Sequence, residues 1–122
     1  MRSNMYIETE QPESQLMPRV AGVPVVRIWS VKPCPDTQPD VLEIMYAFLP
    51  LYWSQEGILD CKLLQSSTDG FLIIESWKSP KDQLKLKNNK SWQDLMHQLE
   101  QLEKLKVLQL KEIANDTFDL IE

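Results

Sequence analysis

Two short segments of this 122-residue chain each place a charged side chain two residues before a tryptophan: Arg27 precedes Trp29, and Glu75 precedes Trp77. Side chains two residues apart on a β-strand project from the same face, so each charge would lie beside an indole. A guanidinium and a carboxylate next to aromatic rings could orient an aromatic or acidic ligand. The same side chains could equally form a satisfied ion pair in a packed interface, so the pattern leaves a ligand site and a structural pair open.

A second candidate region surrounds a proline inside a helical pattern. Pro50 has no N–H to donate to the carbonyl of Tyr46, so we expect the helix to kink or end there. A kink would free a carbonyl and could open the edge of a pocket. Tyr46, Tyr52 and Trp53 surround this point and form the expected entrance for a ligand. Trp92 is a further candidate for the pocket, although an aromatic at helical spacing is first interpreted as core.

Other residue types that often carry chemistry give weaker signals. His97 is the only histidine, and on a helical wheel it falls beside Gln93 and Gln101, which predicts a surface position. Cys34 and Cys61 lack metal-ligand spacing and are expected to be free thiols, the second of them in the core. The sequence contains no nucleophile–base arrangement and no phosphate-binding loop. The catalytic residues are therefore unknown, and we expect no metal and no cofactor.

The elements that would position these side chains follow from the apolar periodicity. Apolar stretches bounded by proline or glycine predict strands, and apolar residues at helical spacing predict helices. Helix-start signals occur at Asp36–Asp40 and at Ser79–Asp82, and Ser91–Asp94 repeats the start after an Asn-Asn interruption. The predicted order is β-α-β-β-α-β, with strands at 23–31, 59–66, 71–77 and 107–113 and helices from 36–40 to about Gly57 and from 79 to 105.

The strands are apolar on both faces. Phe71 to Ile74 are four consecutive apolar residues, and Val25, Val26 and Ile28 give the first strand the same character. If the helices pack on one face of the sheet, the other face leaves an apolar patch that monomers rarely expose. A second copy placed sheet to sheet would cover this patch, so we expect a homodimer.

Length and composition fit one domain. We expect a flexible N-terminal arm at residues 1–20, one domain at 21–116, and a C-terminal tail at 117–122 that could cross to the partner subunit. No apolar run approaches the roughly 20 residues of a membrane helix, which argues against a membrane partner. The chain starts without the features of a secretion signal and carries few cysteines, so we expect a cytoplasmic protein.

A nucleic-acid partner is disfavoured by charge. The net charge is −5 and the sequence pI is about 4.9. RNA-recognition domains share the predicted element order, but they need a basic residue before Gly-aromatic on the third strand. Here Asp69 precedes Gly70 and Phe71, so the RNA-binding interpretation is rejected.

From Val23 to Ile113 the chain resembles the antibiotic-biosynthesis-monooxygenase-like family, whose domains form dimeric α+β barrels. The resemblance rests on the element order, on Gly57-Ile58-Leu59 entering the second strand, and on the segment Phe71-x-x-x-Glu75-x-Trp77-x-Ser79. Trp92 lies where such sequences commonly have an aromatic. The resemblance implies an α+β, ferredoxin-like fold with a four-stranded antiparallel sheet.

The resemblance also implies two functional hypotheses. One is a monooxygenase without metal or flavin that holds a small, electron-rich aromatic molecule between sheet and helices while its deprotonated form reacts with O₂. The haem-degrading members use an Asn where this chain has Val26, a Trp where it has Leu86, and a haem-ligating His near the position of Met96. The alternative hypothesis is a non-catalytic dimeric barrel that serves as a ligand-binding or interaction module.

Overall fold

The computed structural model describes residues 24–67 and 70–118. The predicted order β-α-β-β-α-β is confirmed, with the second helix divided in two and a short 3₁₀ turn added after the first strand. The elements in chain order are β1 (Val25–Pro33), η1 (Pro35–Thr37), α2 (Gln38–Trp53), β2 (Ile58–Gln65), β3 (Phe71–Trp77), α3 (Pro80–Leu86), α4 (Lys90–Lys104) and β4 (Leu108–Thr117).

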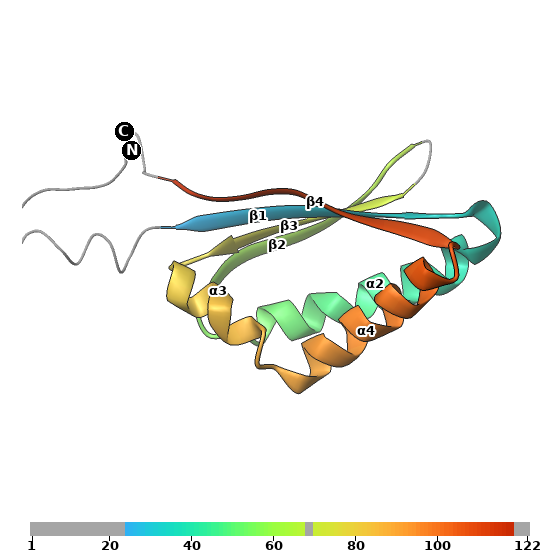
Figure 1. Ribbon diagram of the computed structural model, residues 1–122. Helices are drawn as coiled ribbons and strands as arrows, with labels where there is room; N and C mark the ends of the chain where they lie inside the picture. The colour runs from blue at the N-terminus through green and yellow to red at the C-terminus, as the bar shows by residue number, and fades with distance from the viewer. Residues whose placement is uncertain (1–23, 68–69, 119–122) are drawn as a thin grey trace, which may run out of the picture.

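The strands form one four-stranded sheet in the order β2-β3-β1-β4, and every neighbouring pair is antiparallel. The central strands β1 and β3 pair with Arg27 opposite Glu75 and Val25 opposite Trp77. Helices α2, α3 and α4 all lie on one side of this sheet (Figure 1). The chain therefore has the predicted α+β, ferredoxin-like architecture, in which the inward side chains of the two central strands face the helices.

The core lies between the sheet and the helices. Alternate residues of β3 are buried, beginning with Phe71 and ending with Trp77, and β1 and α2 supply further buried side chains. The other face of the sheet is also apolar, because Ile28, Leu72 and Ile74 project there and are only partly buried. No described helix covers that face (Figure 1).

The two C-terminal helices begin at side-chain caps. The hydroxyl of Ser79 accepts from the backbone N–H of Asp82, as the sequence predicts. The start predicted at Ser91 is wrong by two residues: Asn89 caps α4 by accepting from the N–H of Trp92. Asn89 has extended backbone angles, and its amide oxygen reaches the N–H of Trp92 in the first turn of α4. The residue that ends the interruption between the helices therefore also caps the second one.

Helix α2 continues through its proline. Pro50 lies inside the helix and is exposed, and α2 ends at Trp53. The helix thus does not end at Pro50, and its C-cap is Ser54 in place of the expected Gly57. Gly57 instead lies in the turn to β2 with a φ of +90°, and a Cβ there would lie 2.3 Å from Cγ of Asp82. The turn therefore packs directly against the start of α3.

The ends of the chain are described only in part. The expected arm at 1–20 and the end of the tail, residues 119–122, lie outside the described residues. Thr117 is the last residue of β4, and the N–H of Phe118 donates to the carbonyl of Pro24, so the final strand extends beyond the predicted end at Ile113. None of the helices in the described part of the chain is long and apolar enough to cross a membrane.

Candidate functional site

A carboxylate is completely buried between the sheet and the helices. Glu75 has no solvent-exposed surface, and it projects from the middle of β3 on the face that α2 covers. Strand alternation accounts for this position, because Ile73 and Trp77 flank Glu75 on the same face and are buried as well. An isolated buried carboxylate would be strongly destabilising, so its partners define the site.

Four donors satisfy the Glu75 carboxylate. Its Oε2 accepts from the phenol of Tyr52 at 2.5 Å, from Nε1 of Trp29 at 2.6 Å and from Nη1 of Arg27 at 3.0 Å. Its Oε1 accepts from Nε1 of Trp77 at 2.9 Å. The donors come from β1, β3 and α2, so this carboxylate joins the two central strands to the long helix. We call Glu75 and these four partners the Glu75 cluster.

Arg27 balances the charge of the cluster and connects it to the outer strand β4. Its Nε lies 2.8 Å from Oε1 of Glu112, and its guanidinium carbon lies 5.4 Å from the centre of the Trp29 ring. Burial by itself lowers the pKa of Arg27, but the charge of Glu75 and the hydrogen bond to Glu112 raise it above its ordinary value. The guanidinium is thus a permanent cation between two carboxylates.

Tyr52 connects the carboxylate to α4. Its hydroxyl donates to Glu75 and accepts a long hydrogen bond of 3.4 Å from Nε1 of Trp92. Burial and the neighbouring Glu75 charge raise the pKa of Tyr52 well above its ordinary value, so the phenol keeps its proton. Trp92 is half-buried, whereas Tyr52 has no exposed surface.

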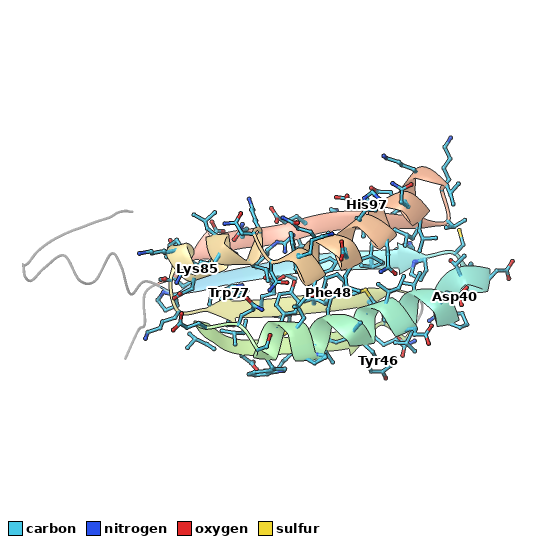
Figure 2. All side chains as sticks on the ribbon, turned by 90° about the horizontal axis from the view of Figure 1, so that it is seen from below. Asp40, Tyr46, Phe48, Trp77, Lys85 and His97 are labelled. Carbon is cyan, nitrogen blue, oxygen red and sulfur yellow. The ribbon has the colours of Figure 1, made fainter. Side chains whose placement is uncertain are left out.

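Aromatic rings enclose the cluster. Trp29 meets Phe48 edge-on with ring centres 5.4 Å apart, Phe48 stacks on Tyr52 at 6.0 Å, and Tyr52 meets Trp77 edge-on at 6.2 Å. Figure 2, seen from the helix side, shows Phe48 and Trp77 in the seam between α2 and α4. These rings form an aromatic shell around the Glu75 carboxylate, which has no contact with solvent.

The structure brings together six of the eight residues that the sequence nominated: Arg27, Trp29, Tyr52, Glu75, Trp77 and Trp92. Tyr46 and Trp53 lie elsewhere. They are 59% and 52% exposed, and Tyr46 lies on the side of α2 that faces away from α4 (Figure 2). Since α2 does not end at Pro50, successive turns place Tyr52 inward and these two aromatics outward.

Two residues of the site were not nominated from the sequence. Phe48 is not among the candidates from the sequence, although its ring packs against both Trp29 and Tyr52. The sequence around Glu112 has no apolar pattern that would identify it as a site residue. A register shift between Ile28 and Trp29 places it opposite Trp29, on the same face as Arg27. Simple alternation along β4 cannot reveal such a shift.

The remaining candidate residues lie away from the cluster. His97 is exposed on α4, as predicted (Figure 2). Both cysteines are free: Cys34 is exposed, and Cys61 is buried, with its thiol pKa raised to about 12 by burial and the charge of Glu75. Within residues 24–67 and 70–118, no three His, Cys, Asp or Glu side chains come together as a metal site.

Surface hollows lie at the end of the sheet where β1 leads into η1. One of about 770 Å³ is lined by Lys32, Cys34, Gln38, Glu103 and Lys106, among others. Another, of about 310 Å³, lies beside the turn between β2 and β3. None of the cluster residues lines either of these two hollows.

Solved structures share this fold. No family model and no curated protein matches the sequence. A Bacteroides thetaiotaomicron protein of unknown function, described as a possible oxidoreductase, is 15% identical with a TM-score of 0.69, covering 80% of this chain and all of that one. A proposed antibiotic biosynthesis monooxygenase from Nitrosomonas europaea is 18% identical (TM-score 0.62; 80% of this chain, 91% of that one).

SnoaB, a cofactor-independent oxygenase from Streptomyces nogalater, is 9% identical with a TM-score of 0.62, covering 81% of this chain and 94% of that one. Several of the similar structures are thus named antibiotic biosynthesis monooxygenases or oxygenases, as the sequence resemblance predicts. At these identities the likeness establishes that the chain has the α+β fold of those proteins.

Proposed function

We propose that this protein is a cofactor-independent monooxygenase-like protein that binds and oxidises a small aromatic molecule between the sheet and the helices. One observation carries the proposal: the Glu75 carboxylate is buried and enclosed by aromatic side chains in the layer between them. The likeness to SnoaB, which is a cofactor-independent oxygenase, supports the same class of reaction.

The proposed reaction requires few catalytic groups from the protein. An electron-rich aromatic substrate loses a proton, and its anion gives the electrons that reduce O₂. One oxygen atom enters the substrate, and the other leaves as water with two substrate hydrogens. The protein contributes orientation, exclusion of water and a proton acceptor. Oε1 of Glu75 accepts one hydrogen bond among the described residues, so it has capacity for a second, from a substrate hydroxyl or C–H acid.

Access to the cluster would come through α4. Trp92 is the half-buried neighbour of the cluster, and its hydrogen bond to Tyr52 is the longest of those described above. Moving the Trp92 indole outward would expose the Tyr52 hydroxyl while leaving the ion pair of Arg27 and Glu75 intact. This route replaces the entrance beside Pro50, because Tyr46 and Trp53 point away from the cluster.

We also propose that the chain is a homodimer formed through the open face of the sheet. Val26, Ile28, Leu72 and Ile74 lie on the two central strands of that face and are partly buried, and Leu64 on β2 is 45% exposed. Water would otherwise meet apolar side chains on three neighbouring strands. A second sheet packed against it would bury these side chains from both subunits.

Oxygen consumption tests the activity. Purified protein is mixed with anthrone or 1,4-dihydroxynaphthalene as the probe, and O₂ uptake is followed beside a protein-free control. We expect uptake above the spontaneous rate, and we expect Glu75→Gln to reduce it at least tenfold because an amide cannot accept a full proton; tenfold corresponds to about 1.4 kcal/mol. Glu112→Gln is the matched control, since Glu112 also pairs with Arg27 but is half-exposed.

The alternative is a ligand-binding or interaction module without catalysis. It is favoured by the saturation of Oε2, which already accepts from three donors, and by the complete burial of Tyr52 and Trp77. Native mass spectrometry of gently purified protein separates the two. A retained small molecule with no O₂ uptake on any aromatic probe would support the module and contradict the oxygenase.

A further inference from the structure

Three oxidisable side chains are linked from the buried carboxylate to the surface. Tyr52 lies at the centre, with the Trp77 ring centre 6.2 Å from its own and the indole N–H of Trp92 3.4 Å from its oxygen. Tyrosine and tryptophan are the side chains that lose one electron most readily besides the thiol of cysteine. Trp92 is half-buried, so the series begins inside the protein and reaches the molecular surface.

Oxidation of a buried phenol requires a place for its proton. Removing one electron from a phenol makes it strongly acidic, and an uncompensated cation in the core would be costly. The Tyr52 hydroxyl points at Oε2 of Glu75, 2.5 Å away, which is within the range of direct proton transfer. Before oxidation, burial and the Glu75 charge keep the phenol protonated, so electron loss and proton transfer are coupled.

The surroundings would stabilise the product as well. After the transfer, the neutral carboxyl of Glu75 can still accept from Trp29 and Trp77, while Arg27 keeps its second partner Glu112. The phenoxyl oxygen can accept from the Trp92 N–H, as the phenol does. None of these hydrogen bonds has to break, so the reorganisation on oxidation is small.

We propose that Tyr52 is a one-electron redox site, with Glu75 as its proton acceptor and Trp92 as its electron connection to the surface. In the balanced step, Tyr52–OH and Glu75–COO⁻ give Tyr52–O• and Glu75–COOH, and the electron passes through Trp92 to an external one-electron oxidant such as a peroxide-derived radical. The oxidising equivalent of the external oxidant is thereby held in the core as the Tyr52 phenoxyl radical. The proposal is independent of the oxygenase function, because it needs no substrate between sheet and helices.

The test uses photo-oxidation of the full chain. A background protein carries Tyr6→Phe and Tyr46→Phe, which leaves Tyr52 as the only one of the three tyrosines. Flash-oxidised ruthenium tris-bipyridine with persulfate is the one-electron oxidant, and transient absorption and electron paramagnetic resonance detect the tyrosyl radical. We expect a tyrosyl signal in this protein and its loss when Tyr52→Phe is added. An equal signal in both proteins would overturn the redox site.

Two further measurements test the roles of the neighbours. Radical formation should slow several-fold in D₂O, and Trp92→Phe should lower the yield several-fold, because phenylalanine is far harder to oxidise than tryptophan. The solvent isotope effect is measured with Glu75 intact, so it remains informative if a Glu75 variant folds poorly. A rate that is unchanged in D₂O would contradict proton transfer to Glu75, and an unchanged yield in Trp92→Phe would contradict the surface connection.

A matched tryptophan variant controls for general loss of oxidisable side chains. Trp53 is 52% exposed on α2 and has no described contact with the cluster. Trp53→Phe should leave the Tyr52 radical yield unchanged, and a loss equal to that of Trp92→Phe would show that any surface indole serves, against the proposed path.

Discussion

The phenolic hydroxyl of Tyr52 on α2 donates a hydrogen bond of 2.5 Å to Glu75 on β3, and this contact joins the long helix to the centre of the sheet. Both side chains are fully buried. A hydrogen bond to a buried charged group contributes more than one between neutral groups, because losing it leaves the charge unsolvated. The stability of the domain should therefore depend strongly on this pair.

Removing the carboxylate should be severely destabilising. Glu75→Ala leaves the Arg27 guanidinium without its buried partner and three other donors unpaired, so we expect a loss of about 3–5 kcal/mol in the free energy of unfolding. Glu75→Gln should lose less, about 1–3 kcal/mol, since the amide oxygen still accepts. Urea denaturation measures both. If Glu75→Ala cost no more than the exposed control Glu43→Ala, the cluster would not be a stabilising centre.

The start of α4 can be tested with two neighbouring substitutions. Asn89→Ala removes the side chain that accepts from the N–H of Trp92, and we expect a loss of about 1 kcal/mol. Ser91→Ala lies inside the helix on its exposed side and should change stability by less than about 0.5 kcal/mol. Thermal unfolding of the two variants under the same conditions provides the comparison. A larger effect of Ser91→Ala than of Asn89→Ala would instead support Ser91 as the N-cap, as the sequence alone predicts.

Gly57 should not tolerate a side chain. Its φ of +90° is strained for alanine, and the new Cβ would meet the side chain of Asp82 at 2.3 Å. We expect Gly57→Ala to lose about 1–3 kcal/mol of stability, measured by urea denaturation. Adding Asp82→Ala to Gly57→Ala removes the contacts with Cγ and Oδ2 of Asp82, but the contact of 2.5 Å with its Cβ and the backbone strain remain. The double variant should therefore recover part of the loss after correction for Asp82→Ala alone. Full additivity of the two losses would show that the side chains do not meet.

Stability should fall at alkaline pH. The pKa of the Cys61 thiol rises from 9.0 to about 12 on folding, chiefly through burial, and the Tyr52 pKa also rises well above 10.0. For a group whose folded pKa is raised, the stabilisation is complete below the unfolded pKa and is lost as pH rises toward the folded pKa. Denaturation midpoints should therefore decrease from about pH 9 to pH 12.

Cys61→Ala and Tyr52→Phe should each flatten this pH dependence, and Cys34→Ala, which removes an exposed thiol, should leave it unchanged. Identical slopes in all four proteins would assign the alkaline loss to other groups.

A charge on the open face of the sheet should disrupt the proposed dimer. Ile74→Lys places an ammonium at the centre of that face, opposite Ile28 on the neighbouring strand, where a partner sheet would bury it. We expect a dimer for the unmodified chain and a monomer for Ile74→Lys in native mass spectrometry. Tyr46→Lys, on the exposed side of α2, is the matched control and should remain a dimer. A monomeric unmodified chain would refute the homodimer.

Local pattern predicted much of this fold because strand and helix periodicities are properties of short segments. The third strand is predicted at 71–77 and observed at Phe71–Trp77. Alternation correctly places Glu75 with Trp77 and Arg27 with Trp29 on shared faces. The cap at Ser79 follows from its spacing to Asp82, since an N-cap contact spans only three residues.

The sequence by itself thus determined the element order, the doubly apolar sheet and the surface position of His97. Only the tertiary structure decided that Tyr52 meets Glu75 while Tyr46 and Trp53 face outward, because that depends on how far α2 continues past Pro50 and on the rotation at which it packs. It also decided that Glu112 joins Arg27, through a shift in strand register. Contacts between elements depend on register and packing, and these are set by the whole core.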